Sequence, residues 1–361
     1  MKQENTHYRD RFDRVIADTL GQAIRIVAAD PALVIPGSVL LHHQRKAAQV
    51  RKKYEQEGLL VPPVMIISIT SRCNLACAGC YMKQQREHQT PEMSQDLLCS
   101  IVSEAADLGV SVVVIAGGEP LLRKDEILSL AHSFPHILFP LFTNGLMIDK
   151  DSAGEIAKQK NIVPLISFEG FRPDTDSRRG SGIYDRLLTS CSVLKGNGIF
   201  FGCSVTVTRG NIDQVTEDRF IQGMMDAGAR VFTFVEYVPI EPGTEDLVLT
   251  RDQQKSLYAH MSAFEMQFPA LFIGFPGDEE QYGGCLAAGR GFIHISSSGN
   301  VEPCPAAPFS DASLTRVSLR DALGSPLFDT IRQHHDLLTE TKGGCALWTN
   351  REWVQKLMQK P

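Results

Sequence analysis

Three cysteines within eight residues constrain this chain more than any other feature of its sequence. Cys73, Cys77 and Cys80 follow a short apolar segment in the pattern C-x3-C-x2-C. Thiolates are the usual ligands of iron–sulfur clusters, and a closed [4Fe–4S] site generally has four of them. A loop with three thiolates leaves one iron of such a cluster open to a small chelating molecule. A zinc site that lacks one ligand and three unrelated cysteines are the alternatives.

The composition indicates a folded, mildly acidic protein. The chain has 361 residues, of which 43% are hydrophobic, and this length fits one barrel and a smaller module. The net charge of −6 argues against a protein that binds nucleic acid through bulk charge. The first 20 residues lack the apolar stretch of a signal peptide, and no run is long enough to span a membrane. Nine cysteines without an export signal indicate reduced thiols and a cytoplasmic location.

The first 60 residues are expected to be helical. Apolar residues recur with helical period over residues 10–29, and Asp30-Pro31 and Pro36-Gly37 interrupt the pattern. A second helix is expected over about residues 39–57. Its basic side is expected to be a solvated face, and contact with an anionic substrate or a lipid surface is the alternative. The basic residues of this helix are Arg45, Lys46, Arg51, Lys52 and Lys53.

From Val64 the sequence alternates between short apolar strands and helices. Repeated β–α units predict a parallel sheet with right-handed crossovers, and six units predict an α/β fold with a partial (β/α)6 TIM-like barrel. The alternation is expected to end at Pro239. A long helix at 251–268, a hairpin at 292–304 and a helical stretch at 319–338 are expected after it. The six strands are expected over residues 64–70, 110–116, 137–142, 163–168, 199–207 and 230–235. Helices are expected between them, including one over 95–108 that Ser94 can cap and Gly109 ends, and one over 214–227.

Three domains are predicted from this pattern: an N-terminal helical extension at 1–60, the barrel at 61–269 and a small C-terminal α+β domain at 270–361. In parallel α/β folds the chemistry lies at the carboxyl ends of the strands. The distinctive segments of the sequence fall at those ends. The cysteines follow the first strand, residues 117–120 the second, residues 143–145 the third and Glu169 the fourth.

These motifs, in this order, resemble those of the radical S-adenosylmethionine (SAM) superfamily over roughly residues 64–240. The resemblance implies that Cys73, Cys77 and Cys80 hold a [4Fe–4S] cluster whose open iron is chelated by SAM. It implies that reduction of this cluster cleaves SAM and produces a 5′-deoxyadenosyl radical, which abstracts a hydrogen atom from the substrate. An electron donor such as flavodoxin or ferredoxin is the expected protein partner, and no nucleic acid is expected.

The resemblance assigns the segment after the second strand to SAM. Gly117, Gly118, Glu119 and Pro120 match the family's glycine-rich stretch, which lies beside the methionine end of SAM. Glycines allow backbone polar groups to approach a ligand because they have no Cβ. Glu119 is expected to accept a hydrogen bond from the SAM ammonium group. Without its position after a strand, this segment would be interpreted as a turn.

Further SAM-binding residues are implied by the same resemblance. Ser167 and Glu169 match the pair that binds the SAM ribose, although the family often has aspartate in place of Glu169. Arg179 is expected to bind the SAM carboxylate through its fork of donors. Asn144 belongs to a motif that recurs in relatives, and Tyr81 is expected to flank the adenine. A solvated loop, a plain turn and an aromatic packed on the barrel rim are the alternatives for Arg179, Asn144 and Tyr81.

The C-terminal section contains a second cysteine pattern. Cys285 and Cys304 frame C-x13-G-x4-C, which resembles the start of the SPASM domain or of its shortened twitch form. This resemblance implies an auxiliary [4Fe–4S] cluster with Cys345 as its third ligand. A full SPASM domain has about seven cysteines, and this section has three. The fourth position is therefore an open iron, a side chain such as His294 or Asp278, or an outside cysteine, and three buried cysteines without a cluster are the alternative.

A radical SAM oxidoreductase or maturase is the function that these patterns favour. A peptide side chain and a small molecule are both expected substrates, and a lipid precursor is a weaker possibility. An iron–sulfur electron carrier or redox sensor without SAM turnover is the alternative, and a zinc-binding structural protein is the third. The segment 117–120 and the pair Ser167/Glu169 discriminate between them, because a carrier needs no SAM pocket.

Overall fold

A continuous sheet of ten strands forms the centre of the computed structural model, which describes residues 26, 34–84, 91–276, 284–338 and 345–358. The strand order is β10-β9-β8-β1-β2-β3-β4-β5-β6-β7. Strands β1 to β7 run parallel in sequence order, and β8 is parallel to β1. Strand β9 is antiparallel to β8, and β10 is antiparallel to β9. The predicted helix at 10–29 lies outside the described residues, apart from Ile26.

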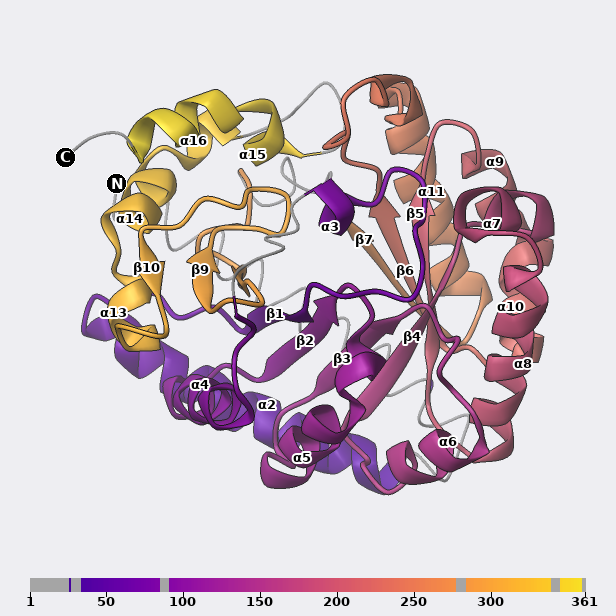
Figure 1. Ribbon diagram of the computed structural model, residues 1–361, viewed down its shortest axis with the longest axis horizontal. Helices are drawn as coiled ribbons and strands as arrows, with labels where there is room; N and C mark the ends of the chain where they lie inside the picture. The colour runs from indigo at the N-terminus through magenta and orange to yellow at the C-terminus, as the bar shows by residue number, and fades with distance from the viewer. Residues whose placement is uncertain (1–25, 27–33, 85–90, 277–283, 339–344, 359–361) are drawn as a thin grey trace.

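The first six strands confirm the predicted β–α series, with bounds that differ by a few residues. Together with the helices on the outer side of the strands, they confirm the predicted α/β fold (Figure 1). The strands are β1 Val64–Thr70, β2 Val112–Gly117, β3 Phe139–Thr143, β4 Ile162–Phe168, β5 Gly202–Val207, β6 Val231–Glu236, β7 Leu271–Phe275, β8 Phe292–Ile295, β9 Asn300–Glu302 and β10 Ala312–Ser313.

The prediction that the β–α rhythm ends at Pro239 is wrong. After the long helix, β7 pairs with β6 and continues the parallel sheet, and β8 extends the other side of the sheet by pairing with β1. The predicted hairpin is confirmed as β8–β9, but its pairing with β1 joins residues more than two hundred positions apart, which no local pattern encodes. The sheet is thus continuous across the predicted boundary at residues 269–270, and the division into three domains stays a prediction.

Helices cover the sheet and the C-terminal section (Figure 1). The series after β1 follows the predicted order, and the predicted helix at 214–227 consists of two pieces, α9 and α10. The helices are α2 Val34–Gln56, α3 Tyr81–Gln84, α4 Gln95–Leu108, η2 Pro120–Arg123, α5 Lys124–Ser133, α6 Lys150–Ile156, α7 Arg172–Arg179, α8 Ile183–Gly196, α9 Ile212–Val215, α10 Asp218–Ala227, η3 Glu245–Leu247, α11 Arg251–Gln267, α13 Leu319–Leu323, α14 Pro326–Gln333, η4 His335–Leu338, α15 Ala346–Thr349 and α16 Arg351–Leu357.

Helix α4 shows how local signals set the ends of these elements. The Ser94 side chain accepts a hydrogen bond from the backbone N–H of Leu97, which satisfies one of the free donors of the first turn. Gly109 follows the last turn with φ 93°, a left-handed conformation that favours glycine at a helix end. The sequence predicted both ends of this helix correctly, because both signals are local.

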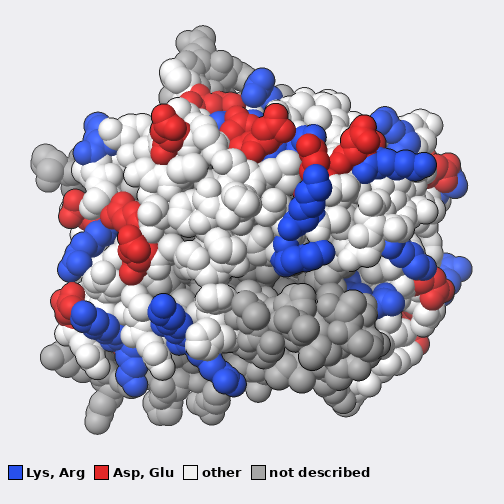
Figure 2. Space-filling model, turned by 90° about the horizontal axis from the view of Figure 1, so that it is seen from below, with Lys and Arg blue, Asp and Glu red and all other residues white. Residues whose placement is uncertain are grey.

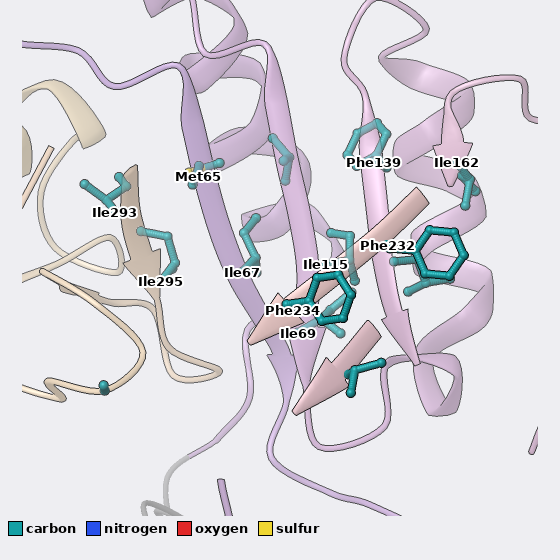
Figure 3. Packing of buried hydrophobic residues seen from close by; sticks show 14 of the residues in the cluster. Met65, Ile67, Ile69, Ile115, Phe139, Ile162, Phe232, Phe234, Ile293 and Ile295 are labelled. Carbon is teal, nitrogen blue, oxygen red and sulfur yellow. The ribbon is translucent and has the colours of Figure 1, made fainter. Parts of the chain in front are cut away.

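The core lies between the sheet and its outer helices. Met65, Ile67 and Ile69 of β1 are fully buried, whereas the alternating Val64 and Ile66 are partly exposed. Figure 3 shows these three buried side chains in a row along β1, with Ile293 and Ile295 of β8 on the neighbouring strand. Alternate residues of a strand point to opposite faces, so one face of β1 packs in the core, and the other is partly accessible at its start and buried from Ser68 onward.

Helix α2 begins at Val34, so the predicted interruption at Pro36-Gly37 is wrong. Proline is tolerated in the first turn of a helix, because the N–H that it lacks has no partner there. The side chain of Gln44 donates to Ser111 O at 3.2 Å, and Arg51 donates to Gly109 O at 2.6 Å, which anchors α2 beside the α4–β2 turn. Arg51 is therefore a structural contact.

The other basic residues of α2 are exposed, which confirms the predicted solvated face for them. On the side of the molecule seen in Figure 2, Lys and Arg side chains are interspersed with Asp and Glu. Over the described ranges, none of the helices combines the length and the apolarity that crossing a membrane requires.

A cluster of imidazoles beside α2 generates a prediction about pH. The rings of His43 and His136 lie 6.0 Å apart, and burial, followed by His43 and Lys46, lowers the pKa of His136, with Asp107 opposing. A lowered pKa in the folded state gives stability that is present above the unfolded value of about 6.5 and is lost below it. The free energy of unfolding in urea should fall less between pH 7 and 5 in His136→Gln than in the native chain.

The matched control is the exposed His132 of α5, whose change to glutamine should leave the pH slope unchanged. If the free energy of unfolding falls equally between pH 7 and 5 in the native chain and in His136→Gln, the lowered pKa of His136 is not the cause of the fall.

Candidate active site

The three N-terminal cysteines lie on a loop, residues 73–80, that follows β1 at the carboxyl edge of the parallel strands. This cysteine loop has no regular secondary structure and is held by neighbouring strand ends. The backbone N–H of Ala78 donates to Arg178 O at 3.1 Å, and the Arg178 side chain donates to Ala78 O at 3.0 Å. The N–H of Gly79 donates to the Glu241 carboxylate at 3.1 Å. Helix α7 and the segment after β6 therefore fix the loop conformation.

Glu119 is buried and links the ends of β2 and β3. Its carboxylate accepts hydrogen bonds from the Leu121 N–H at 3.0 Å, the Thr143 hydroxyl at 2.6 Å and the Asn144 N–H at 2.8 Å. Burial raises the pKa of Glu119, and these donors oppose that shift. Three of about four acceptor positions of the carboxylate are thus used by the protein itself. The expected bond to the SAM ammonium group stays a prediction, and Glu119 has a structural role beside it.

Asn144 is more than a residue of a plain turn. Its amide nitrogen donates to Asn74 Oδ1 at 2.6 Å and lies 3.9 Å from the Cys73 sulfur, and its amide oxygen accepts from the Leu146 N–H. Glu119 therefore orients the segment after β3, and Asn144 transmits that orientation to the cysteine loop.

The glycines after β2 are required by the protein's own backbone. A Cβ on Gly118 would lie 2.0 Å from Arg72 O, and one on Gly117, which has φ 132°, would lie 2.4 Å from Thr70 O. The Gly118 N–H donates to Thr70 O at 2.8 Å across this close approach. The backbone of Thr70 and Arg72, just before the cysteine loop, fills the space that a Cβ would need, and the expected approach of a ligand to these glycines stays a prediction. Pro120 begins η2 and is buried.

Glu169 lies at the end of β4 with two arginines around it. Arg179 contacts one carboxylate oxygen through Nη2 at 2.6 Å and Nε at 2.9 Å, and Arg178 Nη1 lies 2.7 Å from the other oxygen. The carboxylate is almost fully buried. Helix α7, which no local sequence signal predicts, carries both arginines. The expected role of Arg179 toward the SAM carboxylate stays a prediction, and its present partner is Glu169.

Ser167 begins a row of hydroxyl side chains across three strands. It is in register with Ser204 of β5, which is in register with Thr233 of β6. Ser167 is partly exposed, whereas Ser204 and Thr233 are buried. Because residues in register share one face of a sheet, the three hydroxyls lie on the same side of the sheet.

Burial and nearby positive charge act in opposite directions on the thiols of the cysteine loop. Burial raises the pKa of Cys73 and of Cys77, and Arg179 and Arg178 oppose the shift at Cys77. All three cysteines are free and partly exposed. Within the part of the chain that the structure describes, no three His, Cys, Asp or Glu side chains are grouped closely enough for a single metal ion, as a zinc site requires. An iron–sulfur cluster binds each thiolate at a different iron, so its ligands are spaced more widely.

The three C-terminal cysteines, Cys285, Cys304 and Cys345, come together from distant parts of the chain. A hydrogen bond with the Cys345 side chain, burial and the nearby Cys285 hold the pKa of Cys304 well above its usual range. Cys285 and Cys345 are buried. The three thiols of the second pattern therefore lie near one another, and the auxiliary cluster that they were predicted to hold stays a prediction.

Tyr81 lies near a cysteine of each group. It follows Cys80 in sequence, and burial raises the pKa of its phenol, with further contributions from Cys80, Cys304 and Glu302. The side chain thus reaches from the cysteine loop toward the hairpin that carries Cys304. The expected contact with adenine stays a prediction, and the proximity to Cys304 was not foreseen.

Two side chains were predicted as possible fourth ligands of the auxiliary cluster, His294 and Asp278. Both ring nitrogens of His294 are in use, because Nε2 lies 2.8 Å from Ser68 Oγ and Nδ1 lies 2.7 Å from Glu302 Oε2. His294 therefore has no nitrogen available for a metal in this conformation. Asp278 lies outside the described residues.

Comparisons with known proteins show what this chain is similar to. The family model of the Radical SAM superfamily matches residues 67–227. The mycofactocin maturase MftC of Mycolicibacterium smegmatis is 29% identical over 310 residues, which cover 81% of this chain and 76% of that protein. The PqqA peptide cyclase of Gluconobacter oxydans is 24% identical and covers 75% of this chain and 79% of that protein.

Solved structures share the fold. SuiB of Streptococcus suis bound to S-adenosylmethionine has a TM-score of 0.66 at 20% identity and covers 81% of this chain and 75% of SuiB. SuiB bound to its precursor peptide SuiA gives the same TM-score and identity, with 83% and 76% covered. These matches confirm the predicted partial barrel and the predicted enzyme class. The chain carries a radical SAM domain at residues 67–227 and, with maturases among its relatives, is an enzyme.

Proposed function

We propose that this enzyme cleaves SAM at a [4Fe–4S] cluster held by Cys73, Cys77 and Cys80, and that the resulting radical removes a hydrogen atom from a peptide side chain. The observation that carries the proposal is the convergence of four strand ends on the cysteine loop. Glu119, Asn144 and the α7 arginines all reach this loop or its immediate neighbours. An electron carrier would need the thiols but not the motifs after β2, β3 and β4.

Each of these groups has a task in the proposed site. The cluster, when bound, supplies the electron that breaks the sulfonium bond of SAM. Arg178 and Arg179 place positive charge beside Cys77, which favours a thiolate there. Their shared partner Glu169 keeps both guanidinium groups oriented, because a charge-assisted contact fixes geometry as well as charge. Ser167, at the partly exposed end of its hydroxyl row, is the proposed contact of the SAM ribose.

A peptide is the proposed substrate because of what the relatives act on. MftC and the PqqA peptide cyclase carry the names of a maturase and of a peptide cyclase, and SuiB has been solved with a precursor peptide. A small molecule is the second candidate, because the heme synthase of Methanosarcina barkeri is also similar, at 24% identity over 79% of this chain. A flavodoxin or ferredoxin is the proposed electron donor.

The C-terminal cysteines are proposed to hold an auxiliary [4Fe–4S] cluster. The contact between Cys304 and Cys345, with Cys285 nearby, supports this proposal. With His294 bonded at both nitrogens, an open iron or a ligand from outside the described residues would complete the site. Tyr81, with its phenol near Cys304, would separate this site from the SAM-binding loop.

Iron content tests the two sites separately. The anaerobically reconstituted chain should bind about eight irons, and the Cys73→Ala/Cys77→Ala/Cys80→Ala triple variant about four, because each cluster holds four irons. The Cys285→Ala/Cys304→Ala/Cys345→Ala triple variant should also bind about four. The single variant Cys99→Ala on α4 is the control and should bind as the parent does. A parent that holds only four irons would contradict the auxiliary cluster.

Removal of one hydroxyl tests the ribose contact. Ser167→Ala should weaken SAM binding about two- to tenfold without changing iron content, because a neutral hydrogen bond has a net value of about 0.5–1.5 kcal/mol. Equilibrium binding of SAM to the reconstituted protein measures this change. Ser204→Ala, which removes the same group from the next strand, is the control and should bind SAM normally. Equal affinities of both variants and the parent would remove Ser167 from the site.

Isotope transfer tests the reaction itself. Peptides encoded beside the gene, made with deuterated side chains, should transfer deuterium into 5′-deoxyadenosine when SAM and a strong reductant are present. Mass spectrometry of 5′-deoxyadenosine measures the transfer, and the Cys73/Cys77/Cys80 variant is the blank. Formation of 5′-deoxyadenosine that contains no deuterium from any peptide would favour the small-molecule candidate.

A further inference from the structure

A buried chain of hydrogen bonds joins β1 to the β8–β9 hairpin. Ser68 Oγ lies 2.8 Å from His294 Nε2, and His294 Nδ1 lies 2.7 Å from Glu302 Oε2. The three residues are 1%, 3% and 5% exposed. They come from three adjacent strands, because β8 lies between β1 and β9 in the sheet and His294 is directly in register with Glu302.

The partners of His294 favour one tautomer of the neutral ring. With the Glu302 carboxylate as acceptor, the proton lies on Nδ1, and Nε2 is then free to accept from the Ser68 hydroxyl. The same order of hydroxyl, imidazole and carboxylate occurs in nucleophilic triads. Here the Ser68 hydroxyl is buried and its other neighbour is the Met82 sulfur, at 3.9 Å. No substrate can reach it in this conformation, so the chain of bonds serves the structure.

Burial of these groups has a physical consequence for the sheet. Polar side chains lose water when they are buried, and an apolar set of similar volume would pack at least as well. A polar set differs in that each donor requires its acceptor, so a shift of one strand leaves buried groups unsatisfied. Strand β8 pairs with β1 over only Phe292–Ile295. The hydrogen bonds of His294 therefore help to set the position of this short strand, together with the buried Ile293 and Ile295.

The hairpin that His294 fixes leads directly to the second group of cysteines. Cys304 follows Glu302 by two residues. The phenol of Tyr81, which adjoins Cys80, lies near both Glu302 and Cys304. A displacement of the hairpin would therefore change the position of Cys304 relative to Tyr81 and to the cysteine loop.

We propose that Ser68, His294 and Glu302 form a lock that fixes the C-terminal cysteines relative to the radical SAM barrel. His294 is its central positioning residue. The lock sets the separation between the two groups of cysteines. It rests on the proposed function, because one of these groups is the proposed auxiliary-cluster site. Its consequence can be measured without any cluster, from the accessibility of Cys304 in the iron-free chain.

The reactivity of Cys304 toward a thiol reagent, followed by peptide mapping of the full iron-free chain, tests the lock. His294→Phe removes both hydrogen bonds and should raise the rate of Cys304 modification about ten- to a hundredfold, the factor that corresponds to loss of one buried charge-assisted bond. His294→Asn retains a donor toward Glu302 and should restore most of the protection. The control is His260→Phe, at an exposed histidine of α11, which should match the native rate.

A second variant covers the case in which phenylalanine at position 294 prevents folding. Ser68→Ala removes one bond with a small loss of volume and should raise the modification rate in the same direction. Native-rate modification of Cys304 in a folded His294→Phe chain, or in Ser68→Ala if the former does not fold, would overturn the proposal.

Iron binding separates this proposal from the proposed function. In the Cys73/Cys77/Cys80 triple variant, His294→Phe should change the electron paramagnetic resonance spectrum of the remaining cluster, and His294→Asn should return it toward the parent spectrum. An unchanged spectrum in His294→Phe would contradict the lock. If the triple variant binds no iron, the auxiliary cluster is rejected, and Cys304 reactivity still decides for or against the lock.

Discussion

The conformation of the cysteine loop depends on the paired hydrogen bonds between Ala78 and Arg178. The loop has no helix or strand of its own around its thiols, so its shape is set from outside. Arg178 contributes its backbone oxygen, its side chain and its ion contact with Glu169 to this task. Because the same arginine lies near Cys77, the group that positions the loop also sets the charge around its thiols. Helix α7 therefore contributes to both the geometry and the electrostatics of this site.

The two buried carboxylates of the site, Glu119 and Glu169, bind groups of the protein itself. Glu119 binds donors from the ends of β2 and β3, and Glu169 binds two arginines of α7. Buried carboxylates are costly unless hydrogen bonds and opposite charges compensate for lost water, and both residues have such compensation. A site assembled in this way is preorganised, because its orientation is paid for in folding and not when SAM binds.

The sequence predicts the elements that depend on local signals. It does not predict contacts between segments that are distant in the chain. Strand β1 and helix α4 were predicted with their bounds, from an apolar run and from the caps Ser94 and Gly109. Helix α7 was missed because it is short and carries few apolar residues. The pairing of β8 with β1 was missed because it joins distant segments. The cysteines were recognisable from their spacing, but the place of Tyr81 near Cys304 depends on that distant pairing.

The binding of SAM to the open iron is the central claim, and one measurement tests it most directly. Electron–nuclear double resonance of the reduced Cys285/Cys304/Cys345 variant, with SAM labelled with ¹⁵N at its amino group, reports whether that nitrogen binds the cluster. The variant leaves the site of the cysteine loop as the source of the signal. We expect a strong ¹⁵N hyperfine coupling that is absent with unlabelled SAM. A cluster signal that shows no coupling to the labelled nitrogen at saturating SAM would contradict the account.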